Sequence, residues 1–284
     1  MIIREPILAG AWYPDQAAKT QEFLLNIDSN KENSDKNPNK TAFSRVVIAP
    51  HAGWYYSGRI AGISVSNLDR NADTVVIIGG HLSAGSPFLF ADEDAVRTPF
   101  GLMHIDNELM AHIGNKLDAR SDKFDDNTVE ILVPMAHYFF PTSRLLWSRF
   151  PANSSSYEAG KTLVKTAREL GRNLVVIGSA DLTHYGNNYG FSPKGRGKAA
   201  LDWVKNTNDA AFINAVIQND PEKALRCAKE DQSSCSAGAV LGAMGCAEEL
   251  GCFKAQLLEY GTSADVKHDE APDSFVSYAS ILFL

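Results

Sequence analysis

The sequence of 284 residues contains little cysteine, and its four cysteines form no paired CxxC motif: Cys227, Cys235, Cys246 and Cys252. It also lacks any uninterrupted apolar run near the roughly 20 residues that a membrane-spanning helix needs. Near the start, Arg4 and Glu5 occupy positions where a secretory signal would place its apolar segment. We therefore expect a cytoplasmic protein with reduced thiols, no signal peptide and no membrane association.

An excess of positive charge is absent as well. Lys and Arg number 27 against 34 Asp and Glu, a formal net charge of −7, so we expect no binding to nucleic acid or to an anionic membrane. Glycine motifs typical of dinucleotide-binding, P-loop and α/β-hydrolase proteins do not follow the strands predicted below. The content of 44% hydrophobic and 21% charged residues is ordinary for a globular protein that folds without disulfide or metal.

Three short runs of mostly β-branched residues predict buried strands at residues 45–49, 74–78 and 173–177. Their near-continuous apolar character is typical of strands covered on both faces. Further strands are predicted at 88–91, 143–149, 255–260 and 275–283, and helices at 16–27, 107–117, 158–170, 198–218, 221–229 and 236–250. We predict a single α/β domain over residues 1–284, with a central mostly parallel or mixed sheet flanked by helices. The polar stretch 26–41 is predicted to be a surface loop.

Histidines follow all three of the clearest strands. His51 and His81 come two and three residues after the first two, and His184 comes seven residues after the third, together with Asp181. Ligands of open α/β sheets bind beyond the carboxyl ends of the strands, so we expect these side chains to converge. Imidazole combined with carboxylate favours a transition metal over magnesium or calcium. An ordinary loop or capping role for each histidine is the alternative interpretation.

Cys235 lies in the segment SSCSAG, in or beside the first turn of the predicted helix 236–250. A helix N-terminus lowers the pKa of a thiol and favours the thiolate, which is the form that binds metals. A small buried residue at a helix start is an equally weighted alternative. We expect no metal ligation from the other four histidines: His104, His112, His137 and His268.

The segments that carry these residues resemble the Memo family, which includes the bacterial and archaeal proteins called AmmeMemoRadiSam system protein B. The matches extend over nearly the whole chain, in the order AGAWYP (9–14), APHAGWYYSG (49–58), the strand with GGH (75–81), TPFG with the following Asp (98–106), SADLTHYG (179–186) and SSCSAG (233–238).

Memo proteins are similar in fold to the catalytic subunit of class III extradiol dioxygenases, which are non-haem iron enzymes. The resemblance implies a metal site made of His51, His81 and Cys235, with the cysteine in place of the carboxylate of the dioxygenases. It also places Asp181 and His184 in the pocket, where we expect acid–base roles, with Asp181 orienting His184. The implied metal is iron or copper, and zinc is a further option because thiolate favours copper(I) or zinc over hard cations.

One segment departs from the family pattern. Where the family has E-H-S-x-E, this chain has DNTVE (126–130), so Asn127 replaces a histidine. Asparagine does not titrate near neutral pH and is a poor metal ligand. We place Asn127 among the residues expected to contact substrate, together with Tyr55 and Tyr189, because aromatic residues near glycine-rich segments can wall a pocket.

Two functional hypotheses follow from this pattern. The first is a metal-dependent oxidoreductase related to extradiol dioxygenases. The second is a non-catalytic dioxygenase-like scaffold that binds a peptide or a partner protein in the same pocket, which Asn127 favours. A structural zinc site ranks below both, because the candidate ligands are dispersed over more than 180 residues. The resemblance also implies a functional link to a radical-SAM protein and to an AMMECR-type protein.

Overall fold

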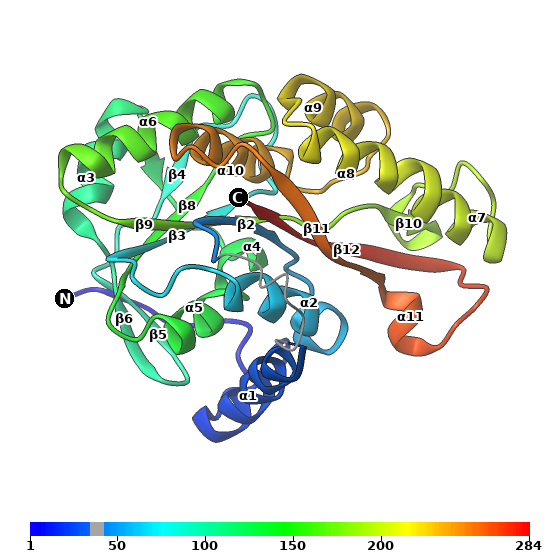
Figure 1. Ribbon diagram of the computed structural model, residues 1–284, viewed down its shortest axis with the longest axis horizontal. Coiled ribbons are helices and arrows are strands. Elements are labelled where there is room, and N and C mark those ends of the chain that lie inside the picture. The colour runs from blue at the N-terminus through cyan, green and yellow to red at the C-terminus, as the bar shows by residue number, and fades with distance from the viewer. Residues whose placement is uncertain (35–42) are drawn as a thin grey trace.

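The computed structural model describes residues 1–34 and 43–284, and these form one α/β domain (Figure 1). In this part of the chain a nine-stranded sheet has the order β10-β12-β2-β9-β3-β8-β4-β7, with β11 paired to β12, and a smaller sheet has the order β1-β5-β6. The strands are β1 (Ile3–Arg4), β2 (Val46–Ala49), β3 (Thr74–Gly79), β4 (Leu89–Phe90), β5 (Ala95–Thr98), β6 (Gly101–His104), β7 (Arg120–Ser121), β8 (Arg144–Arg149), β9 (Leu174–Ser179), β10 (His184–Gly186), β11 (Ala255–Thr262) and β12 (Ser274–Phe283).

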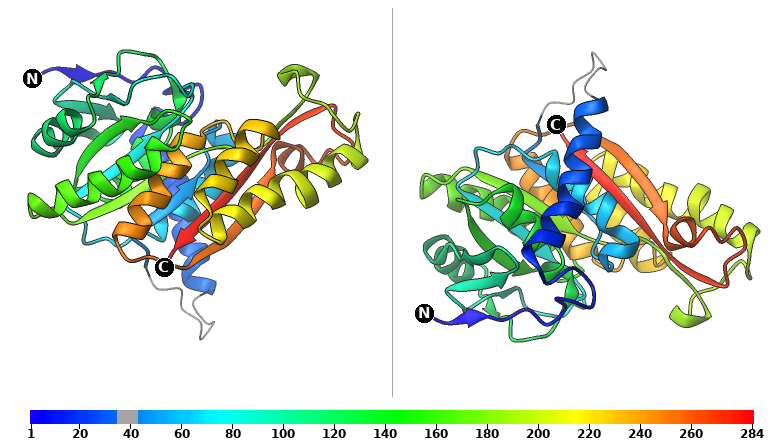
Figure 2. Two further views of the ribbon diagram at one scale, coloured as in Figure 1. Left: turned by 90° about the horizontal axis from the view of Figure 1, so that it is seen from above. Right: turned by 90° about the horizontal axis from the view of Figure 1, so that it is seen from below.

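Helices cover both faces of the large sheet. They are α1 (Ala17–Ser34), α2 (Trp54–Ser66), α3 (Asn107–Lys116), α4 (Asn127–Glu130), α5 (Val133–Phe139), α6 (Ser155–Glu169), η1 (Asn187–Tyr189), α7 (Lys198–Trp203), η2 (Val204–Asn208), α8 (Asp209–Ile217), α9 (Pro221–Glu230), α10 (Ala237–Glu249) and α11 (Ser263–Lys267). Figure 2 shows α6, α8, α9 and α10 on one face and α1 and α2 on the other. This layered arrangement confirms the predicted fold class.

The centre of the sheet is parallel. Strand β9 pairs in parallel with both β2 and β3, and β3 pairs in parallel with β8. Every residue of β2, β3 and β9 is buried, which explains their continuous apolar sequences. Their carboxyl ends lie at one edge of the sheet, and the segments that follow them therefore meet there. β12 is antiparallel to β2, so the sheet is mixed.

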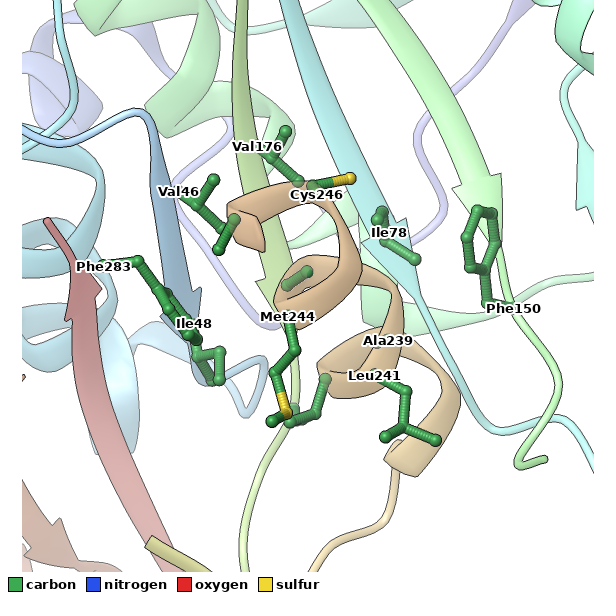
Figure 3. Close-up of a cluster of buried hydrophobic side chains, with 14 of the residues drawn as sticks. Val46, Ile48, Ile78, Phe150, Val176, Ala239, Leu241, Met244, Cys246 and Phe283 are labelled. Carbon is green, nitrogen blue, oxygen red and sulfur yellow. The ribbon is translucent and has the colours of Figure 1, made fainter. Parts of the chain in front are cut away.

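Helix α10 packs its apolar side chains on these strands. Figure 3 shows Met244, Leu241 and Cys246 of this helix among side chains of β2, β3, β9 and β12. The neighbouring helix α6 approaches α10 closely, because a Cβ on Gly160 of α6 would overlap the carbonyl oxygen of Gly242 of α10. The glycines therefore set the position of α10 over the sheet, and with it the position of the residues at its N-terminal end.

The N-terminal helix is longer than expected. The surface loop predicted for residues 26–41 is wrong for its first part, because α1 continues to Ser34. Apolar periodicity detects only the part of a helix that packs on a core, so a helical extension without it leaves no such signal. The rest of the predicted loop, residues 35–41, lies outside the described residues. None of the helices described is both long enough and apolar enough to cross a membrane.

Candidate metal centre

Two histidines and one cysteine meet at the carboxyl edge of the parallel strands. His51 follows β2, His81 follows β3, and Cys235 lies just before α10. One nitrogen of each imidazole and the Cys235 Sγ lie within 4.8 Å of one another. The absence of a side chain at Gly80 permits this, since a Cβ there would overlap Ser236 beside the cysteine. His81 takes a left-handed backbone conformation with φ 55° to turn back over the edge.

His51 is held on every side by hydrogen bonds. Its side chain is 1% exposed, and its Nδ1 lies 2.9 Å from the Ser179 Oγ at the end of β9. Its backbone N–H donates to the Asp181 carboxylate over 2.7 Å. The Asn127 side-chain amide donates to its carbonyl oxygen over 3.0 Å. With Nδ1 engaged by the serine, Nε2 is the ring atom that faces the Cys235 sulfur, at 3.3 Å.

His81 is oriented by a carboxylate that is not among the residues predicted for the site. Its Nδ1 lies 3.0 Å from Asp126, which also caps the short helix α4 by accepting from the Thr128 N–H. Arg149 at the end of β8 lies 3.2 Å from Asp126 and neutralises part of its charge. Burial alone would raise the pKa of Asp126, but these hydrogen bonds and charges hold it well below its ordinary value. The carboxylate is therefore ionised when His81 binds it.

Opposing effects set the protonation of His81. Burial lowers its pKa, whereas hydrogen bonds to Asp126 and Cys235 and the negative charges of both raise it, so that the pKa is about 10. At neutral pH the metal-free site therefore holds a positively charged His81 between a carboxylate and a sulfur.

Cys235 is poised as a thiolate. Burial raises its pKa, but the charge of His51 and hydrogen bonds from His51 and His81 lower it to about 6. This cause of the low pKa differs from the predicted one, which is the N-terminus of the helix. The N-cap of α10 is Ser236, so Cys235 precedes the helix. The histidines supply the positive charge that stabilises the thiolate.

The pKa of Cys235 predicts a pH profile of alkylation. In metal-free protein its reaction with iodoacetamide should accelerate with rising pH through about 6 and level off near neutrality, because only the thiolate is nucleophilic. Peptide mass spectrometry over a pH series measures this rate. Cys252 is the internal control, since burial raises its pKa and its rate should climb only in alkaline solution. A Cys235 rate that still climbs above about pH 8, as for an ordinary thiol, contradicts the prediction.

Asp181 and His184 lie close to the centre, but they are not connected as expected. The His184 Nδ1 donates to the Leu182 carbonyl over 3.1 Å, so the backbone rather than Asp181 orients this ring. Asp181 instead accepts the His51 N–H, and its carboxylate lies 3.9 Å from the His51 Nε2. Burial raises the pKa of Asp181 against the opposing charge of His184 and the hydrogen bond from His51. Asp181 thus holds the loop that carries a candidate ligand.

The two tyrosines expected to contact substrate share one cavity. Tyr55 at the start of α2 and Tyr189 in η1 line a cavity of about 350 Å³, which we call the aromatic cavity. Its aromatic residues are Trp12, Tyr55, Tyr56, Tyr189, Phe275 and Tyr278. Ala52 and Gly53 of its wall follow His51 in the chain, and Tyr189 packs edge-on against the His184 ring at 5.1 Å, whereas none of the three candidate ligands lines it. Asn127 is not part of its lining.

The other four histidines take no part in the three-residue cluster. His137 is buried and its Nδ1 lies 2.7 Å from the Thr98 Oγ1, as suits a core position. The residues that sequence reasoning missed are Asp126 and Ser179, the hydrogen-bond partners of the two imidazoles. Asp126 is the first residue of the DNTVE segment described above. The sequence there indicates that Asp126 caps a helix through Thr128, but it does not indicate the contact with His81.

Comparison with known proteins extends over the whole domain. The family model described as "Memo-like protein" matches residues 4–282. A MEMO1 family protein of Nitrosopumilus maritimus is 27% identical over 293 residues, covering 100% of both chains. One of Pyrococcus furiosus is 29% identical over 297 residues, covering 99% of both chains. Among solved structures, an uncharacterized protein of Escherichia coli has a TM-score of 0.44 and 12% identity, covering 76% of this chain and 88% of its own.

Proposed function

Since this chain belongs to the family of Memo-like proteins, we propose that it holds one transition-metal ion on His51, His81 and Cys235 and uses it in oxidoreductase chemistry related to that of extradiol dioxygenases. The observation that carries the proposal is the convergence of three ligand atoms within 4.8 Å from segments far apart in the chain. Iron and copper are the proposed metals, with zinc as a further option.

The donor set fits such an ion. Two imidazoles and a thiolate are typical ligands of iron, copper and zinc, and Cys235 is already ionised near neutral pH. The second nitrogen of each imidazole is hydrogen-bonded, His51 to Ser179 and His81 to the Asp126 carboxylate. This is the usual support of metal-binding histidines, because it fixes the ring and makes the free nitrogen a better donor. Three protein ligands leave a coordination position open for a substrate.

A metal bound here would supply Lewis acidity and a redox centre. The surrounding residues would hold the substrate and move its proton. His184 donates Nδ1–H to the Leu182 carbonyl, which fixes the ring and makes Nε2 the atom that would exchange a proton with a substrate hydroxyl. Its ring packs edge-on against Tyr189, which lines the aromatic cavity, where Tyr55 and Tyr189 would contact a flat substrate.

Removing the negative charge beside His81 tests the centre. We expect wild-type protein reconstituted without oxygen to retain about one metal per chain, and Asp126→Asn to bind that metal about 10–100-fold more weakly. Asparagine keeps the helix cap of α4 but withdraws the charge that makes His81 a good donor. Competition with a chelator measures the affinity, and the exposed neighbour in Asp125→Asn serves as the matched control. Wild-type protein that retains no metal contradicts the proposed function, and equal affinity of Asp126→Asn contradicts the role of this carboxylate.

A non-catalytic scaffold that binds a peptide or partner protein is the second candidate function. The observation in its favour is Asn127, whose amide is used to hold the His51 carbonyl and cannot move a proton. Oxygen uptake by metal-loaded protein with a panel of catechols discriminates between the two candidates. Metal-dependent uptake that is lost in His184→Gln favours the oxidoreductase, whereas no uptake together with specific capture of one partner favours the scaffold.

We also propose a cytoplasmic location, which suits four free thiols. The functional link to a radical-SAM protein and an AMMECR-type protein is proposed on the family resemblance.

A further inference from the structure

One positively charged side chain is among the residues that line the aromatic cavity. Lys267, the last residue of α11, lines it, and its Nζ lies 5.5 Å from the centre of the Tyr56 ring. The helix that presents it is anchored by a capping box between Thr262 and Asp265. Lys267 therefore approaches the cavity from an anchored helix.

No carboxylate neutralises this cation among the residues that the structure describes. Of the two acidic residues nearest in sequence, Asp265 is bound by Lys205 over 2.9 Å and closes the capping box with its other oxygen, and Asp269 accepts the Ala271 N–H over 3.0 Å. Lys267 itself makes no ion pair within the described ranges, and its Nζ lies over the π-face of Tyr56. The ammonium group is thus available to an anion that enters the cavity.

The remaining lining suits a planar apolar group. Aromatic rings from α2, η1 and β12 form the walls, and such surfaces favour flat ligands that stack or pack edge-on. A volume of about 350 Å³ is at the small end of ligand pockets. It is large enough for a single substituted ring.

We propose that the aromatic cavity binds a small aromatic carboxylate, with the ring between the tyrosines and the carboxylate on Lys267. The proposal extends the function proposed above, because it assigns the substrate class of the same site. A single ammonium matches a single negative charge. A phosphate monoester, with nearly two charges, is typically bound by clustered arginines or several backbone N–H groups, and the residues lining this cavity include no arginine.

The test compares a carboxylate with its uncharged isostere in metal-free protein. Ligand-observed NMR titrations with 3-phenylpropanoate and 3-phenylpropanamide give the two dissociation constants. Wild-type protein should prefer the carboxylate about fivefold, the effect of one partly exposed ion pair, and high salt should reduce this preference. Lys267→Met should abolish the preference while amide binding persists, and Lys267→Arg should keep it.

Two control variants test whether the preference for the carboxylate arises in the aromatic cavity. Lys229→Met removes an exposed charge from α9 and should leave the preference unchanged. Tyr56→Ala should weaken both ligands, because it removes a wall of the cavity. Equal affinities in wild-type protein, a preference that survives in Lys267→Met, or no binding of either ligand would overturn the proposal. Because these titrations use metal-free protein, failure of the proposed function, seen as failed metal retention, leaves their result intact.

Discussion

Substitution of Cys235 by alanine is expected to lower metal affinity by more than about a hundredfold. Structural zinc sites gain roughly 10–16 kcal/mol from about four ligands, so each ligand contributes on the order of 3 kcal/mol, which is about two powers of ten in affinity. The Cys235 thiolate is the negatively charged donor of the three and therefore the one whose loss the two imidazoles compensate least. His51→Ala and His81→Ala should each have effects of similar size.

The metal content per chain is measured after gel filtration in a buffer that contains a chelator, and absorbance spectra of the metal-loaded variants are recorded. A thiolate bound to copper(II) or cobalt(II) produces a sulfur-to-metal charge-transfer band, which should vanish in Cys235→Ser but persist in a weakened His81→Ala complex. Cys252→Ala is the matched control, because it removes a free thiol outside the cluster. Unchanged stoichiometry in all three ligand variants would remove the metal centre from this edge of the sheet.

Replacing Gly160 by alanine is expected to destabilise the fold by about 1–3 kcal/mol, the usual penalty for overpacking a core. The added methyl group would overlap the Gly242 carbonyl and would also lie 2.9 Å from the Cys246 nitrogen. Both contacts are with backbone, so no change of rotamer relieves them, and α6 and α10 must separate. The greater helix propensity of alanine offsets only about 0.5–1 kcal/mol of the cost.

Gly114→Ala is the matched control, because it makes the same substitution at a helix position with free space around it. Gly114 lies within α3, and a Cβ there would meet nothing within 4 Å. This variant should therefore gain about 0.5–1 kcal/mol in the free energy of unfolding. Urea titrations of both variants give the two values from the midpoint and slope. The close approach of α6 to α10 would be refuted by a Gly160→Ala variant as stable as Gly114→Ala.

Much of the fold follows from local sequence. The apolar runs at 45–49, 74–78 and 173–177 coincide with β2, β3 and β9, and the predicted helices at 158–170 and 236–250 coincide with α6 and α10. The short strands β1, β5 and β6 of the small sheet were not predicted, because two to four residues carry too little periodicity. Family membership also confirms the class III extradiol dioxygenase-like fold expected from the resemblance.

The sequence could single out His51, His81 and Cys235 because each stands beside a strand end or helix start that the sequence marks, and the structure brings the three together. Their supporting residues were not, because Asp126 reaches His81 across 45 positions and Ser179 reaches His51 across 128. The assignment of Asp181 as the partner of His184 was wrong for a related reason. Proximity in sequence suggested a pair, while the fold directs Asp181 to the backbone of His51 and leaves His184 to the Leu182 carbonyl.

The sequence by itself determined the chemistry of the edge: which strands are buried, and that imidazoles and a thiol follow them. Only the tertiary structure decided which atoms meet there, which carboxylate charges His81, and that Lys267 comes to the aromatic cavity. The physical reason is that the burial of a strand depends on its own side chains, whereas contact between strand ends depends on the register of the whole sheet and on how closely α10 can pack over it.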